Sequence, residues 1–427
     1  MRHPIWLSAV ALAVTGLVAA GCSSSGSSSS TGSGTATSGS SSAAAGTGSS
    51  VFGTAKKATG TPYVFGMIND ETGVVTFPEA RQGVIAAANY VNNYLGGING
   101  HPIVIDNCTG DGTPATAARC ANQLVAKHPM AILGAADVGA PASIPIYQHA
   151  NLAYLGGIPF TPVPMTAPNS IQFWSVSVGD NAAAAVYAGK TLGVKSVAIV
   201  YFNNTQGASL LPQITPVFKA AGVTTVKAIP LSPTSPDPSP QAALVESSGA
   251  QLAYIDVPNG CGNMLKALKS VGYTGKIMGI DPCGAPPVIE ASAGGANGMY
   301  IASPFVLQTG TSHDAQLFQA AMKKWAAPGS LVDSISTAGF ATVINVQQML
   351  STVSGTPTTQ SILAAFKSGT HQNFLSHPYT CNGQAMKGAP AICSDYYLMN
   401  QVQNTTITQA NSTDWVTSKG LFQGING

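Results

Sequence analysis

Apolar strand-like segments and amphipathic helical segments alternate along most of this 427-residue chain, and this alternation restricts the fold more than any other feature. Residues 63–68 form a continuous apolar run typical of a strand buried on both faces, and residues 78–95 repeat apolar side chains at helical spacing. Similar pairs follow as far as residue 155, and a second series extends from about residue 179 to residue 302. Strands joined by helices of this length form right-handed crossovers in a parallel sheet. The pattern therefore predicts an α/β fold with two doubly wound parallel-sheet lobes.

The chain changes character after residue 305. Predicted helices at residues 313–325, 334–353 and 360–366 follow one another without strands between them. The last clear strand signal lies at residues 396–399. We expect these helices to complete the first lobe and the final strands to return to the second lobe.

The N-terminus has the pattern of an export signal. A short basic region precedes an apolar run at residues 5–20, which is too short for a comfortable membrane span, and Gly21 and Cys22 follow. We expect residues 1–21 to be a signal peptide and Cys22 to be lipidated, because this junction resembles a bacterial lipoprotein signal. An ordinary signal peptide cleaved near Ala20 is the alternative.

A segment of low complexity follows the signal. Residues 23–50 consist almost only of Ser, Gly, Thr and Ala, which cannot bury enough apolar surface to offset the entropy of ordering. We therefore expect residues 22–58 to form a flexible tether. Together, the signal and the tether predict an exported lipoprotein, anchored to the outer face of the cytoplasmic membrane or held in the periplasm.

The charge of the chain excludes two classes of partner. Charged residues make up 8% of the sequence and the formal net charge is +2, so no basic surface indicates nucleic-acid binding. The arginines are Arg2, Arg81 and Arg119, which is too few for a site built to grip phosphate.

Six cysteines follow the signal and fall into three near pairs, and an oxidising compartment makes disulfides the default for them. Sequence alone permits many pairings. Pairing between neighbours is favoured because each pair flanks a single turn or strand–helix unit, which gives Cys108–Cys120, Cys261–Cys283 and Cys381–Cys393. A zinc site is the alternative, but no Cys-x-x-Cys occurs and no histidine is interleaved at ligand spacing. No metal and no cofactor are therefore expected.

Enzyme signatures are weak. The segment ending in Gly189-Lys190-Thr191 has the end of a phosphate-binding loop but lacks its earlier glycine. No nucleophile elbow and no His-Glu-x-x-His motif occur in the expected folded part. We therefore expect a binding protein without catalytic residues.

Polar side chains follow several of the predicted strands, where open parallel sheets bind their ligands. Asp137 and Asp281 each come just after a strand, and either could meet a cationic group or serve as a helix cap. Hydroxyl, amide and aromatic groups at other strand ends and in the long loop after residue 155 complete a plausible cleft. These further candidates are Asp70, Thr72, Thr161, Tyr201, Asn203, Thr205 and Asn259.

Several segments resemble the periplasmic binding proteins of the branched-chain amino-acid type, which are the solute receptors of ABC importers. The most specific segment is G-G-I-N-G-H-P-I-V-I-D at residues 96–106. Supporting segments lie at residues 141–143, 192–200 and 268–273, in the order that the family has them. The resemblance extends over the chain from about residue 63 onward.

The resemblance implies two α/β lobes joined by three crossovers that close on a ligand by hinge motion. It places lobe I at residues 59–179 and 304–369 and lobe II at residues 180–303 and 370–427, with crossovers near Gly179, Ser303 and Gly369. It also implies an ABC permease in the cytoplasmic membrane as the partner and a monomeric receptor with a small-molecule ligand.

Relatives bind the amine of an amino acid with an acidic residue after a strand of the second lobe, and Asp281 has the matching place. The loops that grip the carboxylate in relatives differ here, since residues 135–139 lack a hydroxyl and contain Asp137, and Thr161 is the nearest hydroxyl in the next loop. We therefore expect a small polar metabolite, either an amino acid, an amide or a related amine. A sensor of the same fold that signals to a partner protein is the first alternative, and a secreted α/β hydrolase is the second.

Overall fold

The structure of the protein is a computed structural model that describes residues 50–73, 76–410 and 414–425. The predicted signal peptide, the proposed lipidation site Cys22 and residues 22–49 of the predicted tether lie outside the described residues. Across the part that is described, no helix is both long and apolar enough to cross a membrane.

Lobe I is built on a parallel sheet with the strand order β2-β1-β3-β4-β5. β1 lies between β2 and β3, and its alternate side chains supply both faces: Phe65 and Met67 join one apolar cluster and Ile68 joins another. The strands are β1 (Tyr63–Asp70), β2 (Ile103–Gly110), β3 (Ala131–Leu133), β4 (Tyr154–Leu155) and β5 (Ser170–Ile171).

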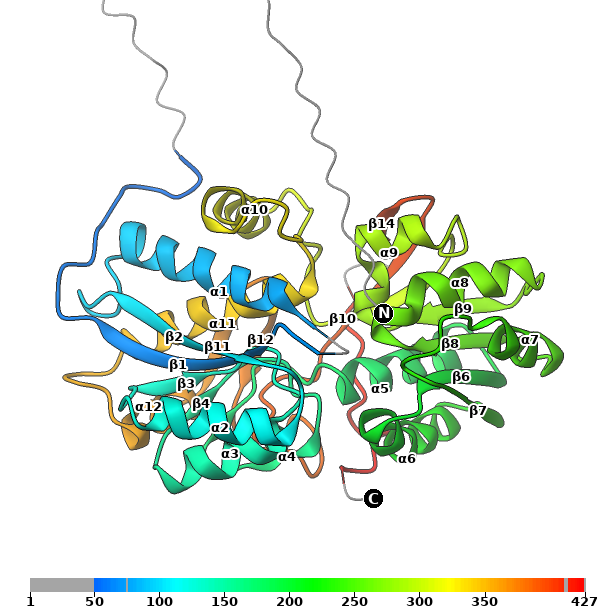
Figure 1. Cartoon of the computed structure of the whole chain (residues 1–427), viewed down its shortest axis with the longest axis horizontal. Coiled ribbons are helices and arrows are strands. Elements are labelled where there is room, and N and C mark those ends of the chain that lie inside the picture. The colour runs from blue at the N-terminus through cyan, green and yellow to red at the C-terminus, as the bar shows by residue number, and fades with distance from the viewer. Residues whose placement is uncertain (1–49, 74–75, 411–413, 426–427) are drawn as a thin grey trace, which may run out of the picture. The chain divides into compact units, whose positions relative to one another are not determined.

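Helices cover both faces of this sheet (Figure 1). α1, α10 and α11 pack together in the cluster that contains Phe65, whereas α2 and α3 pack in the cluster that contains Ile68. The helices of lobe I are α1 (Pro78–Tyr90), which continues as a π-helical turn (Val91–Leu95), α2 (Pro114–Val125), α3 (Ala140–His149), α4 (Pro162–Thr166), α10 (His313–Trp325), α11 (Ser334–Leu350) and α12 (Thr359–Phe366).

α1 and α11 approach each other through two glycines. A Cβ atom added at Gly83 would lie 2.0 Å from the carbonyl oxygen of Ser336, and one added at Gly339 would lie 2.1 Å from the carbonyl oxygen of Ala80. These contacts bring the two backbones together, which no other residue type permits at this separation. The interface joins the first helix of lobe I to a helix that follows five strands of lobe II in the sequence.

Lobe II is built on a sheet with the strand order β14-β13-β10-β9-β8-β6-β7. Five strands are parallel, and the last two form an antiparallel hairpin at the edge beside β10. The strands are β6 (Ser196–Phe202), β7 (Thr225–Leu231), β8 (Leu252–Asp256), β9 (Lys276–Gly279), β10 (Tyr300–Ser303), β13 (Leu398–Gln403) and β14 (Thr406–Gln409).

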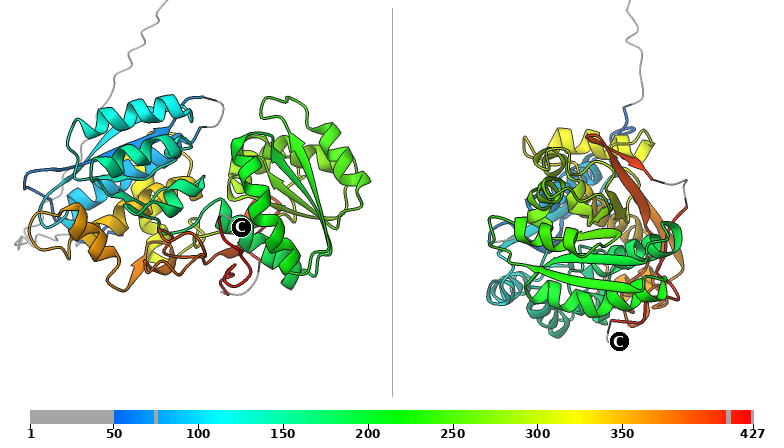
Figure 2. Two further views of the ribbon diagram at one scale, coloured as in Figure 1. Left: turned by 90° about the horizontal axis from the view of Figure 1, so that it is seen from below. Right: turned by 90° about the vertical axis from the view of Figure 1, so that its right-hand side faces the viewer.

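The helices of lobe II lie in two groups, with α5 packed on α6 and α8 packed on both α7 and α9 (Figures 1 and 2). The helices are α5 (Val178–Val186), which continues as a π-helical turn (Tyr187–Thr191), α6 (Thr205–Ala220), α7 (Ser239–Ser247), α8 (Cys261–Ser270) and α9 (Pro286–Ala291), with short 3-10 turns at Pro258–Gly260 and Asp281–Gly284. The predicted α/β fold with parallel-sheet lobes is thus confirmed.

Three chain segments connect the lobes, and two of them run side by side. The first crossover (residues 172–177) follows β5, the second (residues 304–312) follows β10, and the third (residues 381–397) precedes β13. The Gln172 N–H donates to the Ala391 carbonyl at 2.8 Å, and the Cys393 N–H donates to the Gln172 carbonyl at 2.8 Å.

A buried hydroxyl pair strengthens the same junction. The hydroxyl oxygens of Ser175 and Tyr397 lie 2.5 Å apart, and a Cβ at Gly179 would collide with both. The first and third crossovers are therefore tied together where α5 begins.

The position of the third crossover differs from the sequence-based expectation near Gly369. Residues 370–380 form the hairpin β11 (Thr370–Asn373) and β12 (Ser376–Thr380), and Phe374, Leu375 and Tyr379 are buried in the apolar cluster of lobe I. The expected boundary at residue 370 is therefore corrected to the third crossover. The alternating polar sequence of this hairpin carries no strong strand signal, which explains the displacement.

The structure contains disulfides Cys108–Cys120, Cys261–Cys283 and Cys381–Cys393. The first joins β2 to α2, and the second joins the start of α8 to the turn after β9. The third closes the beginning of the third crossover.

The end of the predicted tether belongs to the folded part of the chain. Phe52 lies with its ring centroid 5.0 Å from that of Tyr94 and 5.1 Å from that of Trp325. The Lys324 ammonium lies over the Phe52 ring at 5.0 Å, and Ala58 is buried. Residues 50–58 therefore pack on lobe I, which corrects the tether boundary at residue 58.

Phe52→Ala is expected to destabilise the protein by about 1–2 kcal/mol, since a half-buried aromatic side chain and its ring pairs are lost. Chemical denaturation monitored by circular dichroism measures this change. Val51→Ala in the same segment removes far less buried surface and serves as the control. Equal stability of the Phe52 variant and the native chain would show that the segment does not hold this position in solution.

Candidate functional site

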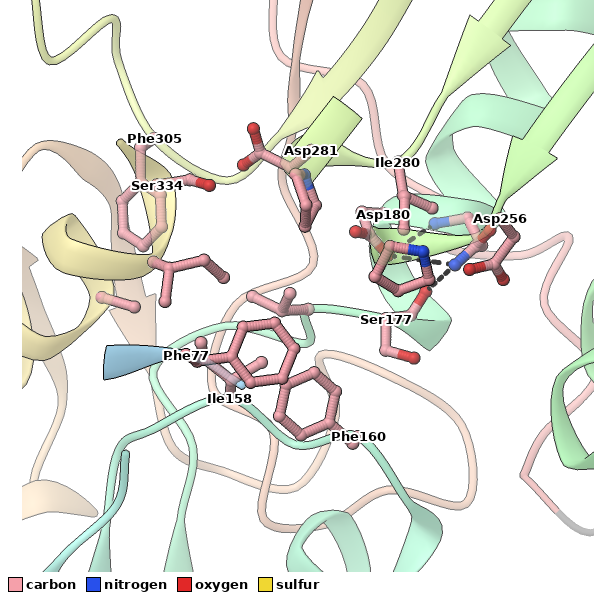
Figure 3. A pocket seen from close by; sticks show the side chains of 16 residues that line it. Phe77, Ile158, Phe160, Ser177, Asp180, Asp256, Ile280, Asp281, Phe305 and Ser334 are labelled. Carbon is pink, nitrogen blue, oxygen red and sulfur yellow. Dashed lines mark hydrogen bonds between the residues drawn. The ribbon is translucent and has the colours of Figure 1, made fainter. Parts of the chain in front are cut away.

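A largely apolar pocket lies among residues of both lobes, with about 500 Å³ of space not filled by atoms, part of which is open solvent (Figure 3). Ten of its sixteen lining residues are apolar, and the other six are Asp, Asn or Ser. The lining residues are Phe77, Ile158, Phe160, Val176, Ser177, Asp180, Asn181, Asp256, Pro258, Ile280, Asp281, Pro282, Phe305, Ser334, Ile335 and Ala338.

The topology of the sheets explains why these residues meet. Asp256 ends β8, and Asp281 follows β9, so both lie at the carboxyl edge of the parallel sheet in lobe II. Asp180 lies in the first turn of α5 directly after the first crossover, and Ser334 begins α11. Ligands of open α/β sheets bind at this edge.

Lobe I supplies an aromatic wall. Phe77 precedes α1 and Phe160 follows β4, and their rings stack with centroids 5.1 Å apart. In Figure 3 these rings and Ile158 lie on one side of the pocket, and Asp180 and Asp256 lie on another. The pocket therefore has an apolar surface and an acidic one.

Asp180 is almost fully buried, and one of its carboxylate oxygens accepts from the Asn181 N–H at 2.8 Å. Burial holds the pKa of Asp180 well above its ordinary value, and the nearby Asp256 and Asp281 carboxylates raise it further. The side chain of Asn181 is engaged elsewhere, because it donates to the Ser177 carbonyl and accepts from the Tyr254 hydroxyl.

Asp281 accepts a hydrogen bond from the Ser303 hydroxyl at 2.9 Å. Burial raises the pKa of Asp281 to about 7, and the charge of Asp333 adds to the rise, whereas hydrogen bonds from Ser303 and Ser334 oppose it. Asp281 is thus held by residues of both lobes, since Ser303 ends β10 and Ser334 begins α11.

Asp256 differs from the other two acids. The residue is 8% exposed, and its side chain forms no hydrogen bond or ion pair with any residue that the structure describes. Burial alone raises the pKa of Asp256 to about 7. It is the acidic group of the pocket whose oxygens are left for a ligand.

Ser177 marks the point where the first crossover enters the pocket. Its backbone φ is +77°, a left-handed conformation that costs energy for a residue with a side chain. The same residue ends the crossover and precedes α5. Local strain is therefore located where the two lobes connect beside the pocket.

A second pocket borders the first and shares Asp281, Pro282 and Ser334 with it. It holds about 790 Å³ of space not filled by atoms and extends toward the β13–β14 turn and the residues before α11. A ligand longer than the first pocket has room to extend past Asp281.

Asp281 is the sequence-predicted residue that lines the first pocket, and the other candidates have different surroundings. Asp70 accepts from the N–H groups of Gly112 and Val138 at 3.0 and 2.8 Å, which fixes two loops of lobe I. Thr72 donates to the Gly110 carbonyl at 3.0 Å, and Asp137 accepts from Ser143 at 2.7 Å. These side chains stabilise loop structure at the edge of the lobe I sheet.

The remaining candidates lie outside the lining of this pocket. Thr161 precedes α4, Tyr201 packs partly buried on the core of lobe II, and Asn203 is exposed. Asn259 borders a separate pocket beside Phe202. The side chain of Thr205, the first residue of α6, is not among those described.

Sequence reasoning missed most of the site. Asp256 ends a strand that the sequence predicts correctly, so the same strand-end rule that selected Asp281 would have found it. Ser177 and Asp180 lie at the start of α5 beside the first crossover, and Ser334 begins α11. No periodic pattern in the sequence marks these positions. The sequence does not reveal the aromatic wall either, because Phe77 and Phe160 resemble ordinary core residues.

Comparison with known families matches residues 62–403 to the family described as periplasmic binding protein. None of the curated proteins that were compared matches the sequence. Solved structures match the fold at low sequence identity, below the level at which likeness in function follows.

Three of these structures illustrate the range of relatives. A leucine-binding protein LivK from Thermotoga maritima has 16% identity and a TM-score of 0.69, covering 83% of this chain and 98% of that one. A fatty acid ABC transporter substrate-binding protein from Thermomonospora curvata has 16% identity and a TM-score of 0.72, covering 86% and 95%. A solute-binding protein of an ABC transporter from R. palustris, in complex with 4-hydroxybenzoate, has 18% identity and a TM-score of 0.67, covering 83% and 95%.

Proposed function

We propose, from the premise that the chain belongs to the periplasmic binding protein family, that it is the extracytoplasmic solute receptor of an ABC importer. In this proposal a small ligand enters the pocket, the lobes close over it by rotation at the crossovers, and the closed form docks on a permease in the cytoplasmic membrane. The observation that carries the proposal is the pocket itself, which takes its lining from the carboxyl edge of the lobe II sheet and from α11 and the aromatic wall of lobe I.

The N-terminal segments fit the same role. A lipid on Cys22 would attach the receptor to the outer face of the cytoplasmic membrane, and the Ser- and Gly-rich residues that follow would give the folded part reach toward its permease. We propose a monomer that acts by binding alone, without catalysis or cofactor. Radiolabelled palmitate incorporation that is lost in Cys22→Ala would support the anchor.

The ligand classes proposed for the pocket are an amino acid, an amide or a related amine. Proteins with the same fold are described as binding leucine, fatty acids and 4-hydroxybenzoate, so the fold alone permits a wide range. The acidic lining of this pocket favours ligands that bear an amino group.

A screen of melting temperatures tests the receptor role. The full-length chain, produced by export, is heated with individual amino acids, amides, amines, carboxylic acids and fatty acids. A true ligand at about 100 times its dissociation constant adds about 2.7 kcal/mol of stability and raises the melting temperature. Small-angle scattering of the same sample should show a smaller radius of gyration, because ligand binding favours the closed form.

Two variants test whether a compound that raises the melting temperature binds in this pocket. Ala338→Phe places a ring in the pocket and should abolish the shift produced by any true ligand. Ala208→Phe places the same ring on an exposed position of α6 and should leave the shift unchanged. A panel in which no compound raises the melting temperature or reduces the radius would contradict the receptor role.

A further inference from the structure

We infer that the ligand is an organic cation with an apolar body and no carboxylate, whose charged group lies between Asp180 and Asp256 and whose body packs on Phe77 and Phe160. This inference rests on the proposed function and specifies the ligand of the same pocket. It differs from an amino-acid site, in which a carboxylate must also be held.

The charge balance of the pocket favours a cationic ligand. Asp180, Asp256 and Asp281 line it, and none of the sixteen lining residues is Lys, Arg or His. Buried carboxylates without a counterion are costly, and charges of the same sign in one pocket repel. A positively charged ligand is the partner that relieves both effects, whereas an anionic ligand would add to them.

The hydrogen bonding of the three acids also favours a cation, independently of their number. Asp180 accepts from the Asn181 N–H, and Asp281 accepts from Ser303, but Asp256 has no hydrogen-bond partner among the described residues although the residue is only 8% exposed. Its carboxylate oxygens are not among the fully enclosed atoms without a partner, and Asp256 lines the pocket. Buried polar groups in native proteins are nearly always hydrogen-bonded. A hydrogen-bond donor on the ligand would satisfy the Asp256 carboxylate. An ammonium group is such a donor and also carries the opposite charge.

The pocket offers few groups for a ligand carboxylate. The start of α5 lies beside the acids, and two of its N–H groups are in use: Gly179 donates to the Ser175 carbonyl and Asn181 donates to the Ser177 carbonyl. Those amides could otherwise hold an anion. These two amides are therefore not left for the carboxylate of an amino acid, and three of the six polar lining residues are themselves acidic.

The apolar lining of the pocket indicates that the part of the ligand beyond its charged group is apolar. Ten of the sixteen lining residues are apolar, including the stacked pair Phe77–Phe160 and the ring of Phe305. A hydrated inorganic ion would leave this surface unused. In the part of the chain that the structure describes, no group of three or more His, Cys, Asp or Glu is arranged to hold a metal ion. An aliphatic or aromatic body buries against these side chains, and an ammonium near a ring gains a further attraction.

Four matched compounds test the inference by isothermal titration calorimetry at about pH 7.5: 2-phenylethylamine, 2-phenylethanol, 3-phenylpropionate and phenylalanine. They share a ring and differ in being cationic, neutral, anionic and zwitterionic. We expect the amine to bind at least about 10-fold more tightly than each of the others, the amount that one charged hydrogen bond supplies. Preferential binding of the acid, the alcohol or phenylalanine would overturn the inference, as would absence of amine binding in the millimolar range.

Asp256→Asn keeps the shape of the side chain and removes its charge. It should weaken the amine by about 10- to 100-fold and change the affinity for the alcohol by less than about 2-fold. Asp395→Asn is the matched control, since Asp395 is also a buried acid but lies in the third crossover, where it accepts from Ser418 and Thr417. An unchanged affinity of the Asp256 variant for the amine would remove the proposed contact.

The pH dependence of amine binding gives a readout that does not need a variant. Asp180 lies near both Asp256 and Asp281. The Tyr254 hydroxyl comes from β8, the strand that Asp256 ends, and lies near Asp180 and Asp256, whereas Asp333 lies near Asp281. The affinity for the amine should rise between about pH 5.5 and pH 8 as the acids lose protons, and the affinity for the alcohol should stay level. If a carboxylic acid bound tightly and the lobes closed on it, the proposal of a cationic ligand would be wrong, but the receptor role would still hold.

Discussion

Gly339→Val is expected to destabilise the protein by about 3 kcal/mol or more. A Cβ at this position would lie 2.1 Å from the Ala80 carbonyl oxygen, 3.0 Å from its carbon and 3.2 Å from the Val84 nitrogen. These are backbone atoms of α1, so no side-chain rotation can relieve the collision and the helices must separate. Overpacking in cores costs about 1–3 kcal/mol when side chains can adjust, and a rigid helix pair costs more.

The comparison needs a control for helix propensity, because glycine disfavours helices by about 1 kcal/mol relative to alanine. Ala320→Val on α10 introduces the same branched side chain at a half-exposed position and should change stability by less than about 1 kcal/mol. Urea denaturation of both variants measures the difference. A Gly339 variant as stable as the Ala320 variant would mean that α1 and α11 do not pack at the separation seen here.

The ligand-free protein is expected to lose several kcal/mol of stability between about pH 4 and pH 8. Burial raises the pKa of Asp137, Asp256, Asp281 and Asp395 to about 7, far above the value of an unfolded chain. Between about pH 4 and pH 7 the folded state therefore binds more protons than the unfolded state, so stability falls as the pH rises through the folded pKa. A drop in melting temperature of about 5–10 °C is the expected size, since each kcal/mol moves a large domain by roughly 2–4 °C.

Variants separate the contributions to this trend. Asp395→Asn removes one titrating group outside the pocket and should flatten the curve in the absence and in the presence of ligand. Asp256→Asn should flatten it only for the empty protein, because a bound cation already favours the ionised form. A melting temperature that rises from pH 5 to pH 8 would contradict the raised pKa of these acids in the folded state.

The fold was predictable because its elements follow local rules. Residues 63–68 and 252–256 are apolar runs bounded by polar loops, and both form strands of parallel sheets. The hairpin β11–β12 was not predictable in the same way, since its polar strands are held by the packing of Phe374 and Tyr379 on a core made elsewhere. Where tertiary contacts decide the structure, local propensity is a weak guide.

The site was predictable only in part, for a related reason. The strand-end rule identifies edges of sheets but does not say which edge faces the other lobe. Asp70 and Asp281 both lie at strand ends, yet Asp70 binds the backbone of neighbouring loops and Asp281 lines the pocket. Which acid meets the ligand depends on the crossovers, whose course is set by contacts far apart in the sequence, such as the one between Ser175 and Tyr397.

The glycine contact between α1 and α11 also bears on the order in which the chain acquires structure. The Gln347 amide donates to the Gly97 carbonyl across a sequence separation of 250 residues, so lobe I lacks one of its covering layers until α11 has been made. Five strands of lobe II come from the uninterrupted stretch between β6 and β10. These strands can pair before α11 packs against α1. Long-range contacts of this kind slow folding because the loop must close first. The N-terminal lobe is therefore expected to be the last to resist proteolysis during refolding.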